Sequence, residues 1–208
     1  MLKKKTILLC VVLIIFLIII FFIKNYYNYS EVGNNKSNKS IEEIEEYILN
    51  IDSYEAKISV TVESNKNTNK YVMIQKYKSP NTSHQIILEP SNIEGVEIIN
   101  DGNNLSVKNT KLNLNSIYEN YEYAVNNCLN LESFIYDYKQ NNGSIYYENN
   151  EIVLETKSNS ENKLIYNKRL YINEQTGNPT KLLIEDINEK KIVYILYNEI
   201  KLIDLNLN

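Results

Sequence analysis

Few residues of this chain have side chains suited to catalysis or metal binding. His84 is the only histidine, and the two cysteines, Cys10 and Cys128, are far apart in the sequence. A catalytic zinc site usually has at least two His or Cys ligands, which this chain does not supply at a usable spacing. A serine triad would need His84 as its base, yet the chain has no G-x-S-x-G elbow and His84 follows Ser83 in a strand pattern. We therefore predict no metal site and no triad, and we interpret His84 as a residue on the face of a strand.

The carboxylates are the other candidates, because two facing carboxyl groups across a cleft can hydrolyse a glycosidic bond. Three groups stand close in the sequence, namely Glu42, Glu43, Glu45 and Glu46; Glu132 and Asp137; and Glu185 and Asp186. Charged runs usually face solvent and no cleft is predicted between these groups, so we interpret all three as solvated. The chain also lacks a Walker loop and a G-x-G-x-x-G turn. We predict no catalytic residue, no cofactor and no enzymatic activity.

The start of the chain has the pattern of a membrane anchor. An unbroken apolar run from Ile7 to Ile23 is preceded by lysines at positions 3–5 and followed by Lys24. About 17–25 apolar residues cross a bilayer as a helix, and flanking lysines keep their end in the cytoplasm. We predict that residues 1–24 are an uncleaved transmembrane anchor with the rest of the chain outside the cytoplasm. A cleaved signal peptide is the alternative, but its apolar core is only about 7–15 residues and ends in small residues, which are missing here.

Cys10 faintly resembles the acceptor cysteine of a lipoprotein signal, since it follows Ile7-Leu8-Leu9. The residue before it is leucine rather than a small residue, and the apolar run continues past it, so lipidation of Cys10 is the less favoured alternative. Residues 25–39 are rich in Asn, Ser and Tyr and are predicted to be a flexible linker. Residues 40–208 then form a single domain.

The charge of the chain excludes one class of partner. All 26 Asp and Glu lie after residue 24, where 18 of the 22 Lys and Arg also lie, so this outer part has a net charge of −8. Nucleic acids bind basic surfaces, so we predict that no nucleic acid is a partner. We also predict no disulfide, because Cys10 lies in the membrane run and Cys128 on a predicted apolar helix face.

The domain has a helix followed by many short strands. Ser40 and Glu43 fit a capping box at the start of a helix whose apolar stripe includes Ile44 and Ile48. From Tyr54 to Val62 apolar and polar residues alternate, as in a half-buried strand. Further strands are predicted over 70–78, 83–88, 144–148, 151–157, 163–172, 180–186 and 191–199, with the tail 200–208 extending the last one. Short loops between consecutive strands predict an antiparallel meander.

The stretch from Leu88 to Lys139 organises this sheet. Its first half is a hairpin with a type I′ turn at Asn100-Asp101-Gly102-Asn103. Its second half is predicted to be helical. One stripe comprises Ile117, Tyr121, Ala124, Val125, Cys128 and Leu129; the next comprises Leu131, Phe134, Ile135 and Tyr138. We expect the sheet to cover these helices.

Several segments together resemble the spore germination protein GerS family, a branch of the LolA-like carrier-protein superfamily. These segments are Leu88-Glu89-Pro90, Ile93-Glu94-Gly95, Asp101-Gly102-Asn103, Asn109-Thr110, the run Leu114 to Lys139, Leu170-Tyr171-Ile172, the loop Thr176 to Lys181 and the run Tyr194 to Glu199. The resemblance covers residues 40–200. It implies a mainly β (α+β) domain with a strongly curved antiparallel sheet, an incomplete β-barrel of LolA type with plug helices, here preceded by the N-terminal transmembrane helix.

The resemblance also implies a non-enzymatic function in sporulation and germination. Proteins of the GerS family bind and activate the cortex amidase CwlD, a zinc-dependent N-acetylmuramoyl-L-alanine amidase, so that muramic-δ-lactam forms in the spore cortex. The zinc and its ligands belong to the amidase. The implied location is the spore membrane or intermembrane space. Members of the family are lipoproteins, and Cys10 comes too early in this chain to match that pattern.

Two alternatives remain open from the sequence. The first is the amidase regulator; the second is a lipid or lipoprotein carrier that uses the concave face of the sheet. A carrier needs an apolar pocket with room in it, and the plug residues Tyr121, Phe134, Ile135 and Tyr138 favour a filled face. Exposed sheet edges also leave a homodimer or strand swap open. The sequence does not assign the partner-binding face.

Overall fold

The computed structural model describes residues 40–121, 129–159 and 162–203. The predictions for the anchor, the linker, Cys10 and Cys128 fall outside these residues, as does the tail after residue 203. In the described part of the chain, no helix has both the length and the apolar character needed to cross a bilayer.

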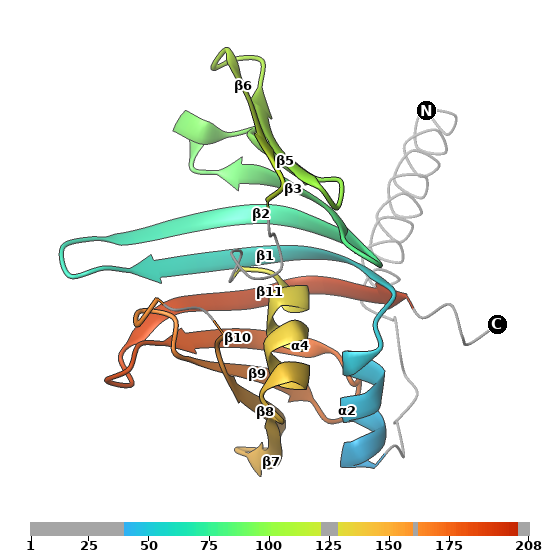
Figure 1. Cartoon of the computed structure of the whole chain (residues 1–208). Helices are drawn as coiled ribbons and strands as arrows, with labels where there is room; N and C mark the ends of the chain where they lie inside the picture. The colour runs from blue at the N-terminus through green and yellow to red at the C-terminus, as the bar shows by residue number, and fades with distance from the viewer. Residues whose placement is uncertain (1–39, 122–128, 160–161, 204–208) are drawn as a thin grey trace, which may run out of the picture. The chain divides into compact units, whose positions relative to one another are not determined.

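In its described residues the domain consists of one antiparallel sheet with two α-helices on one of its faces (Figure 1). The helices are α2 (Ile41–Leu49) and α4 (Leu131–Gln140), and η1 (Ser91–Ile93) is a 3-10 turn. The strands are β1 (Ser53–Glu63), β2 (Thr68–Lys78), β3 (Thr82–Glu89), β4 (Glu97–Asn100), β5 (Asn104–Asn109), β6 (Leu114–Glu119), β7 (Ser144–Glu148), β8 (Glu151–Lys157), β9 (Asn167–Asn173), β10 (Pro179–Glu185) and β11 (Lys191–Ile203).

Two meanders meet in the middle of this sheet. The strand order is β6-β5-β4-β3-β2-β1-β11-β10-β9-β8-β7, so the first and last strands of the domain pair with each other. The sheet is open and curved, with β6 and β7 as its two edges (Figure 1). The predicted antiparallel meander is therefore confirmed, and the β1–β11 pairing joins its two halves within the sheet.

The predicted capping box begins α2. The Ser40 hydroxyl accepts a hydrogen bond from the backbone N–H of Glu43 at 3.2 Å, and the Glu43 carboxylate accepts one from the N–H of Ser40 at 2.7 Å. Both bonds satisfy N–H groups that have no partner inside a helix. Ile44 and Ile48, one turn apart, are fully buried. The helix and its inward face are as predicted.

The core lies between the two helices and the strands that they cover. The buried side chains come mainly from β1, β8, β9, β10 and β11 and from the helices. The largest fully buried apolar ones are Phe134, Ile44, Ile48, Ile58, Leu131, Ile152, Leu154, Leu170, Ile172, Leu182 and Ile184. Phe134 and Tyr138 of α4 stack with ring centroids 5.8 Å apart, and they fill the space in front of the sheet. The apolar stripe of residues 131–138 thus belongs to a helix, as predicted.

The prediction of a helix beginning at Ile117 is wrong. Residues Leu114–Glu119 form strand β6, which pairs with β5, and the side chain of Ile117 is 62% exposed. A tight turn precedes this strand: Asn113 has a φ of +51° and its N–H donates to the carbonyl of Thr110 at 3.2 Å. The turn aligns the following residues with β5, and the sheet pairing outweighs the coincidental helical spacing. Residues 122–128 of the predicted helix lie outside the described residues.

The hairpin turn between β4 and β5 also differs from its prediction. The N–H of Asp101 donates to the carbonyl of Asn104 at 3.2 Å, so the central residues are Gly102 and Asn103. Of these, only Gly102 has a positive φ, +98°. A type I′ turn needs positive φ at both central residues, whereas a type II′ turn has glycine at the first one alone. The hairpin was therefore predicted correctly, but its turn is shifted by one residue and is not of type I′.

Candidate functional site

His84 lies where the sequence predicted, on the face of a strand. Its Nε2 is 2.9 Å from Oε2 of Glu97 on the neighbouring strand, and both side chains are more than a third exposed. Among the described residues, no group of three His, Cys, Asp or Glu side chains could hold a metal ion. The two residues form an ordinary cross-strand pair, which is worth at most about 1 kcal/mol at an exposed position.

The carboxylates that were predicted to face solvent are buried in two of the three groups, and for these the prediction is wrong. Glu132 is 9% exposed, Asp137 3%, Glu185 5% and Asp186 8%. Glu185 pairs with Arg169 of β9 at 2.6 Å. Asp186 accepts two backbone N–H bonds in the turn that follows, from Asn188 at 2.8 Å and Lys190 at 2.9 Å. Glu185 is therefore paired with a cation from the neighbouring strand, and Asp186 is held by backbone donors of its own turn.

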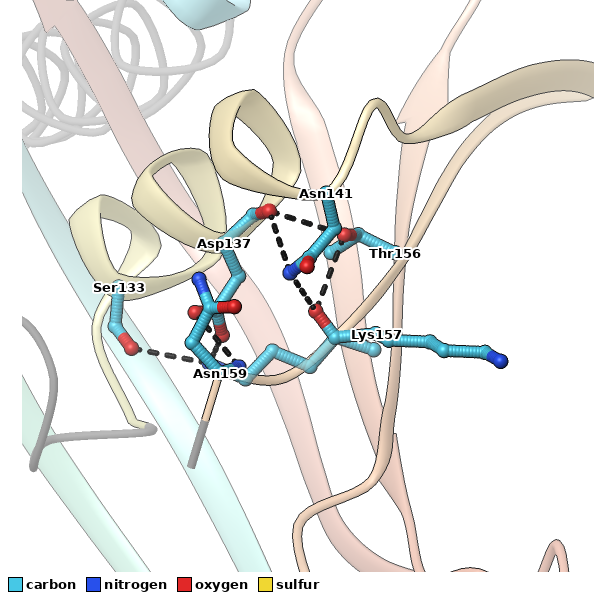
Figure 2. A network of polar contacts seen from close by, with 7 residues as sticks. Ser133, Asp137, Asn141, Thr156, Lys157 and Asn159 are labelled. Carbon is cyan, nitrogen blue, oxygen red and sulfur yellow. Dashed lines mark hydrogen bonds and ion pairs between the residues drawn. The ribbon is translucent and has the colours of Figure 1, made fainter. Parts of the chain in front are cut away.

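Asp137 forms the centre of a polar network between α4 and the sheet (Figure 2). Lys168 of β9 is 2% exposed, and its Nζ is 2.6 Å from Oδ2 of Asp137. The same ammonium donates to the hydroxyl of Ser133, one turn earlier in α4, at 3.0 Å. The other carboxylate oxygen of Asp137 accepts the backbone N–H of Asn159 at 3.2 Å. A buried charge is costly unless it is paired and hydrogen-bonded, and here both charges are.

The network continues through the carbonyl group of Asp137 to the C-terminal end of α4 (Figure 2). The Thr156 hydroxyl donates to this carbonyl at 3.2 Å and the Asn141 amide at 3.1 Å. Asn141 also donates to the carbonyl of Lys157 at 2.9 Å. The same carbonyl also accepts the backbone N–H of Asn141 at 3.0 Å, so the two side chains add to this bond and attach the helix end to β8.

A second buried polar cluster lies at the N-terminal end of α4. Gln75 of β2 donates from Nε2 to the carbonyl of Leu129 and to Oδ1 of Asn130, both at 3.1 Å, and Gln85 of β3 donates to the same Oδ1. Asn130 in turn donates to Oε1 of Glu132 at 3.4 Å. The cluster therefore ties the start of α4 to the half of the sheet opposite Lys168.

Glu132 has an unusual environment in this cluster. Its Oε2 has no hydrogen-bond partner among the described residues. Burial raises the pKa of Glu132 from its usual 4.5 to about 7, against a smaller lowering by the Asn130 hydrogen bond. Burial, followed by the nearby charge of Glu132, also raises the pKa of Tyr77 on β2. The pKa of Glu132 therefore lies much closer to neutral pH than that of an exposed glutamate.

Helix α4 is also joined to α2 by a polar contact. The phenol of Tyr138 donates to Oε1 of Glu45 at 2.5 Å, and burial, followed by this bond, raises the pKa of Tyr138. Gly143 lies beneath the same ring: a Cβ there would be 2.3 Å from Cδ2 of Tyr138 and 2.8 Å from the carbonyl oxygen of Glu155. Only glycine allows the chain to leave α4 this close to the ring and enter β7.

The two buried polar clusters, one around Asp137 and one around Asn130, hold α4 in place rather than expose a reactive group. Lys168 and Asp137 neutralise each other below the surface, at 2% and 4% side-chain exposure, so neither faces a solvent-filled cleft. Sequence reasoning did not single out Lys168. Its position gave a signal, because it alternates with Leu170 and Ile172, which are both fully buried, and therefore has to point inward with them. Gln75 and Gln85 share the inward register of Met73 and Ile87 in the same way.

Comparison with known proteins gives a consistent set of relatives. A family model described as sporulation protein YdcC-like matches residues 3–204. The GerS lipoprotein, in a structure of the CwlD amidase from Clostridioides difficile in complex with GerS, is 27% identical. That match covers 79% of this chain and 96% of the other, with a TM-score of 0.50. No curated protein sequence gives a significant match.

Other solved structures resemble the fold at low sequence identity. An uncharacterised conserved protein from Thermus thermophilus is 13% identical with a TM-score of 0.52, covering 80% of this chain and 90% of that one. A LolA superfamily protein from Nitrosomonas europaea is 14% identical with a TM-score of 0.43, covering 80% and 95% respectively.

Proposed function

The chain belongs to the family of YdcC-like sporulation proteins, and we propose that it is a non-enzymatic accessory protein that binds and activates a cortex amidase of the CwlD type. The resemblance to GerS that the sequence predicted is confirmed by the family match and by the solved GerS structure. GerS occurs there in complex with CwlD, and the match extends over 96% of its chain. This similarity to a protein bound to an amidase is the observation that carries the proposal.

The product of the activated enzyme is the second part of the proposal. An N-acetylmuramoyl-L-alanine amidase removes the stem peptide from muramic acid, and the freed residue is then the precursor of muramic-δ-lactam in the spore cortex. The accessory protein supplies a binding surface, while the amidase supplies the zinc and the chemistry. The rigid attachment of α4 to the sheet by two buried polar clusters supports this division, because a regulator needs a pre-organised surface rather than a reactive centre.

The decisive experiment uses the purified full chain and the cortex amidase of the same organism. We expect the chain to form a stable complex with the amidase on a sizing column and to increase the release of stem peptide from glycan strands. An equal amount of an unrelated acidic protein is the control. If there is neither a complex nor a rise in activity, the proposed function is wrong.

The alternative of a lipid carrier makes a different prediction for the same preparation. A carrier would be purified with lipid, or would take up lipid from vesicles, in front of its sheet. Phe134 and Leu131 are fully buried and Tyr138 is 4% exposed in that region, which supports a filled face. Lipid extraction followed by mass spectrometry of the purified chain separates the two functions.

The location of the domain is also part of the proposal. Residues 7–23 anchor the chain in a spore membrane, with the acidic domain outside the cytoplasm, as the apolar run and the lysines at positions 3–5 indicate. Removing residues 1–24 is expected to move the protein from the membrane fraction to the soluble fraction. Recovery of the shortened chain with the membranes would contradict the anchor.

A further inference from the structure

We propose that strand β6 is the edge at which the partner amidase docks, by adding an extended segment of its own chain as a further strand of the sheet. This inference rests on the proposed function and deepens it, because it assigns the partner-binding face. Three properties of β6 support it. Its apolar side chains are exposed, its pairing with β5 is regular, and it has few of the features that prevent pairing with a foreign strand.

Strand β6 is exposed on both faces. Among the described strands it is the last one of the sheet, and there it pairs with β5 alone. Ile117 is 62% exposed and Tyr118 is 52% exposed, and consecutive residues of a strand point to opposite faces. Leu112, in the turn that leads into β6, is 49% exposed. An apolar edge of this kind is usually covered in the functional state of a protein.

The edge also lacks the features by which proteins prevent unwanted strand pairing. Its sequence, Leu-Asn-Ser-Ile-Tyr-Glu, contains neither lysine nor proline. Its register with β5 is continuous over six pairs, from Asn109 with Leu114 to Asn104 with Glu119, with no bulge that would twist the edge away. Lysines, prolines and bulges are the usual protective features of an exposed edge. Glu119, at the end of the strand, is its one charged residue, so the preceding residues 114–118 are open to pairing with another strand.

The other edge strand, β7, also has no lysine, proline or bulge, but it differs from β6 in the contacts of its tyrosines. The phenol of Tyr146 donates to Glu155 at 2.8 Å, and that of Tyr147 donates to Glu174 at 3.3 Å, so both tyrosines are bound to their own domain. Tyr118 has no such partner among the described residues. The comparison favours β6 as the edge that accepts a partner.

The chemistry of the edge defines what binds to it. An edge strand presents N–H and C=O groups in alternation, and an extended polypeptide is the ligand that pairs with all of them. Apolar side chains of that polypeptide would pack beside Ile117 on one face and beside Tyr118 on the other. The part of the chain after residue 24 has a net charge of −8, from 18 basic and 26 acidic residues, so the docking segment is neutral or basic.

Two substitutions with matched controls test this inference. Ile117→Lys places a charge on the edge, and Leu164→Lys places the same charge on a loop residue that is 55% exposed. Tyr118→Lys and Tyr147→Lys make the same comparison between the two edge strands, because Tyr147 is also 55% exposed. The dissociation constant of each full-length variant for the cognate amidase is measured by calorimetry. We expect it to rise about tenfold or more for the two β6 variants, the loss typical of an interface anchor, and to change less than about twofold for the controls.

Hydrogen exchange on the unmodified chain provides a second test that does not depend on the folding of any variant. Backbone amides of residues 114–119 that are free at the edge should exchange more slowly in the complex, while the exchange rates of those of residues 144–148 should not change.

If the wild-type chain binds the amidase but β6 gains no protection and its variants bind normally, this inference alone is overturned. If the wild-type chain does not bind, both this inference and the proposed function fail. If Ile117→Lys converts a dimer of the chain to a monomer that still binds the amidase, β6 pairs with a second copy and the inference is wrong.

Discussion

Replacing Glu132 by glutamine should remove a large pH dependence from the stability of the domain. The carboxyl group is 9% exposed, Oε2 has no partner among the described residues, and burial raises its pKa to about 7. A glutamate in the unfolded chain titrates near 4.5. Between these two pH values the folded protein holds a proton on Glu132 that the unfolded chain has released.

The sign of the effect follows from this difference in bound protons. Stability falls with increasing pH wherever the folded state binds more protons than the unfolded state. The contribution of Glu132 is therefore fully favourable below about pH 4.5, is lost as the pH rises to about 7, and stays lost above it. One pKa unit corresponds to about 1.4 kcal/mol, so the loss amounts to about 3 kcal/mol. That is a substantial fraction of the 5–15 kcal/mol that is typical of a folded domain.

The assay is urea unfolding of the wild type and of Glu132→Gln from pH 4 to 8, followed by circular dichroism. Glutamine has the size of the protonated acid and never ionises, so the other titrating groups cancel in the difference between the two proteins. We expect the variant to match the wild type at pH 4 and to exceed it by about 3 kcal/mol at pH 8. For the control Glu42→Gln, the change in stability relative to the wild type between pH 4 and pH 8 should have the opposite sign. Hydrogen bonds from its own backbone N–H and from the Ser40 hydroxyl lower the pKa of Glu42. A difference for Glu132→Gln that does not vary with pH would refute the reasoning.

Three further substitutions test the attachment of α4 and the start of α2. Lys168→Met leaves Asp137 buried without its cation and should cost about 3–5 kcal/mol in urea unfolding, and the double change with Asp137→Leu should recover most of it. A single variant as stable as the wild type would show that the pair is not needed. Gly143→Ala forces a methyl group against Tyr138 and should cost about 1–3 kcal/mol, so an unchanged melting temperature would contradict the packing. Ser40→Ala removes one half of the capping box and should cost about 1 kcal/mol in thermal unfolding, whereas no loss would mean that water replaces the cap.

Much of the sheet could be predicted because its signals are local. Alternation from Tyr54 to Val62 placed β1, and turn residues between short apolar runs placed β7 and β8 at their observed bounds. The strand predicted over 163–172 begins only at Asn167, because the N–H of Ile165 closes a turn on the carbonyl of Asn162. Boundaries of this kind depend on hydrogen bonds to the neighbouring strand, which a single stretch of sequence does not contain.

The helical prediction at Ile117 failed for a related reason. Residues 114–119 have their apolar side chains at Leu114, Ile117 and Tyr118, which fits a helical spacing and does not alternate, so the sequence alone favours a helix over a strand. The turn at Thr110–Asn113 decides between them by placing this segment beside β5. An exposed strand of this kind gives a weak signal, since neither face is consistently apolar.

The sequence by itself determined which segments have apolar periodicity, where the chain turns, where α2 is capped and how acidic the domain is, because each of these depends on residues that are neighbours along the chain. It also carried enough pattern to indicate the GerS relationship. Only the tertiary structure decided that Asp137, Lys168 and Glu132 are buried and that β6 is an unprotected edge. The physical reason is that the energy of a buried charge depends on a partner that lies far away in the chain, as Lys168 does from Asp137. Likewise, a strand becomes an edge only through the order in which the whole sheet is assembled.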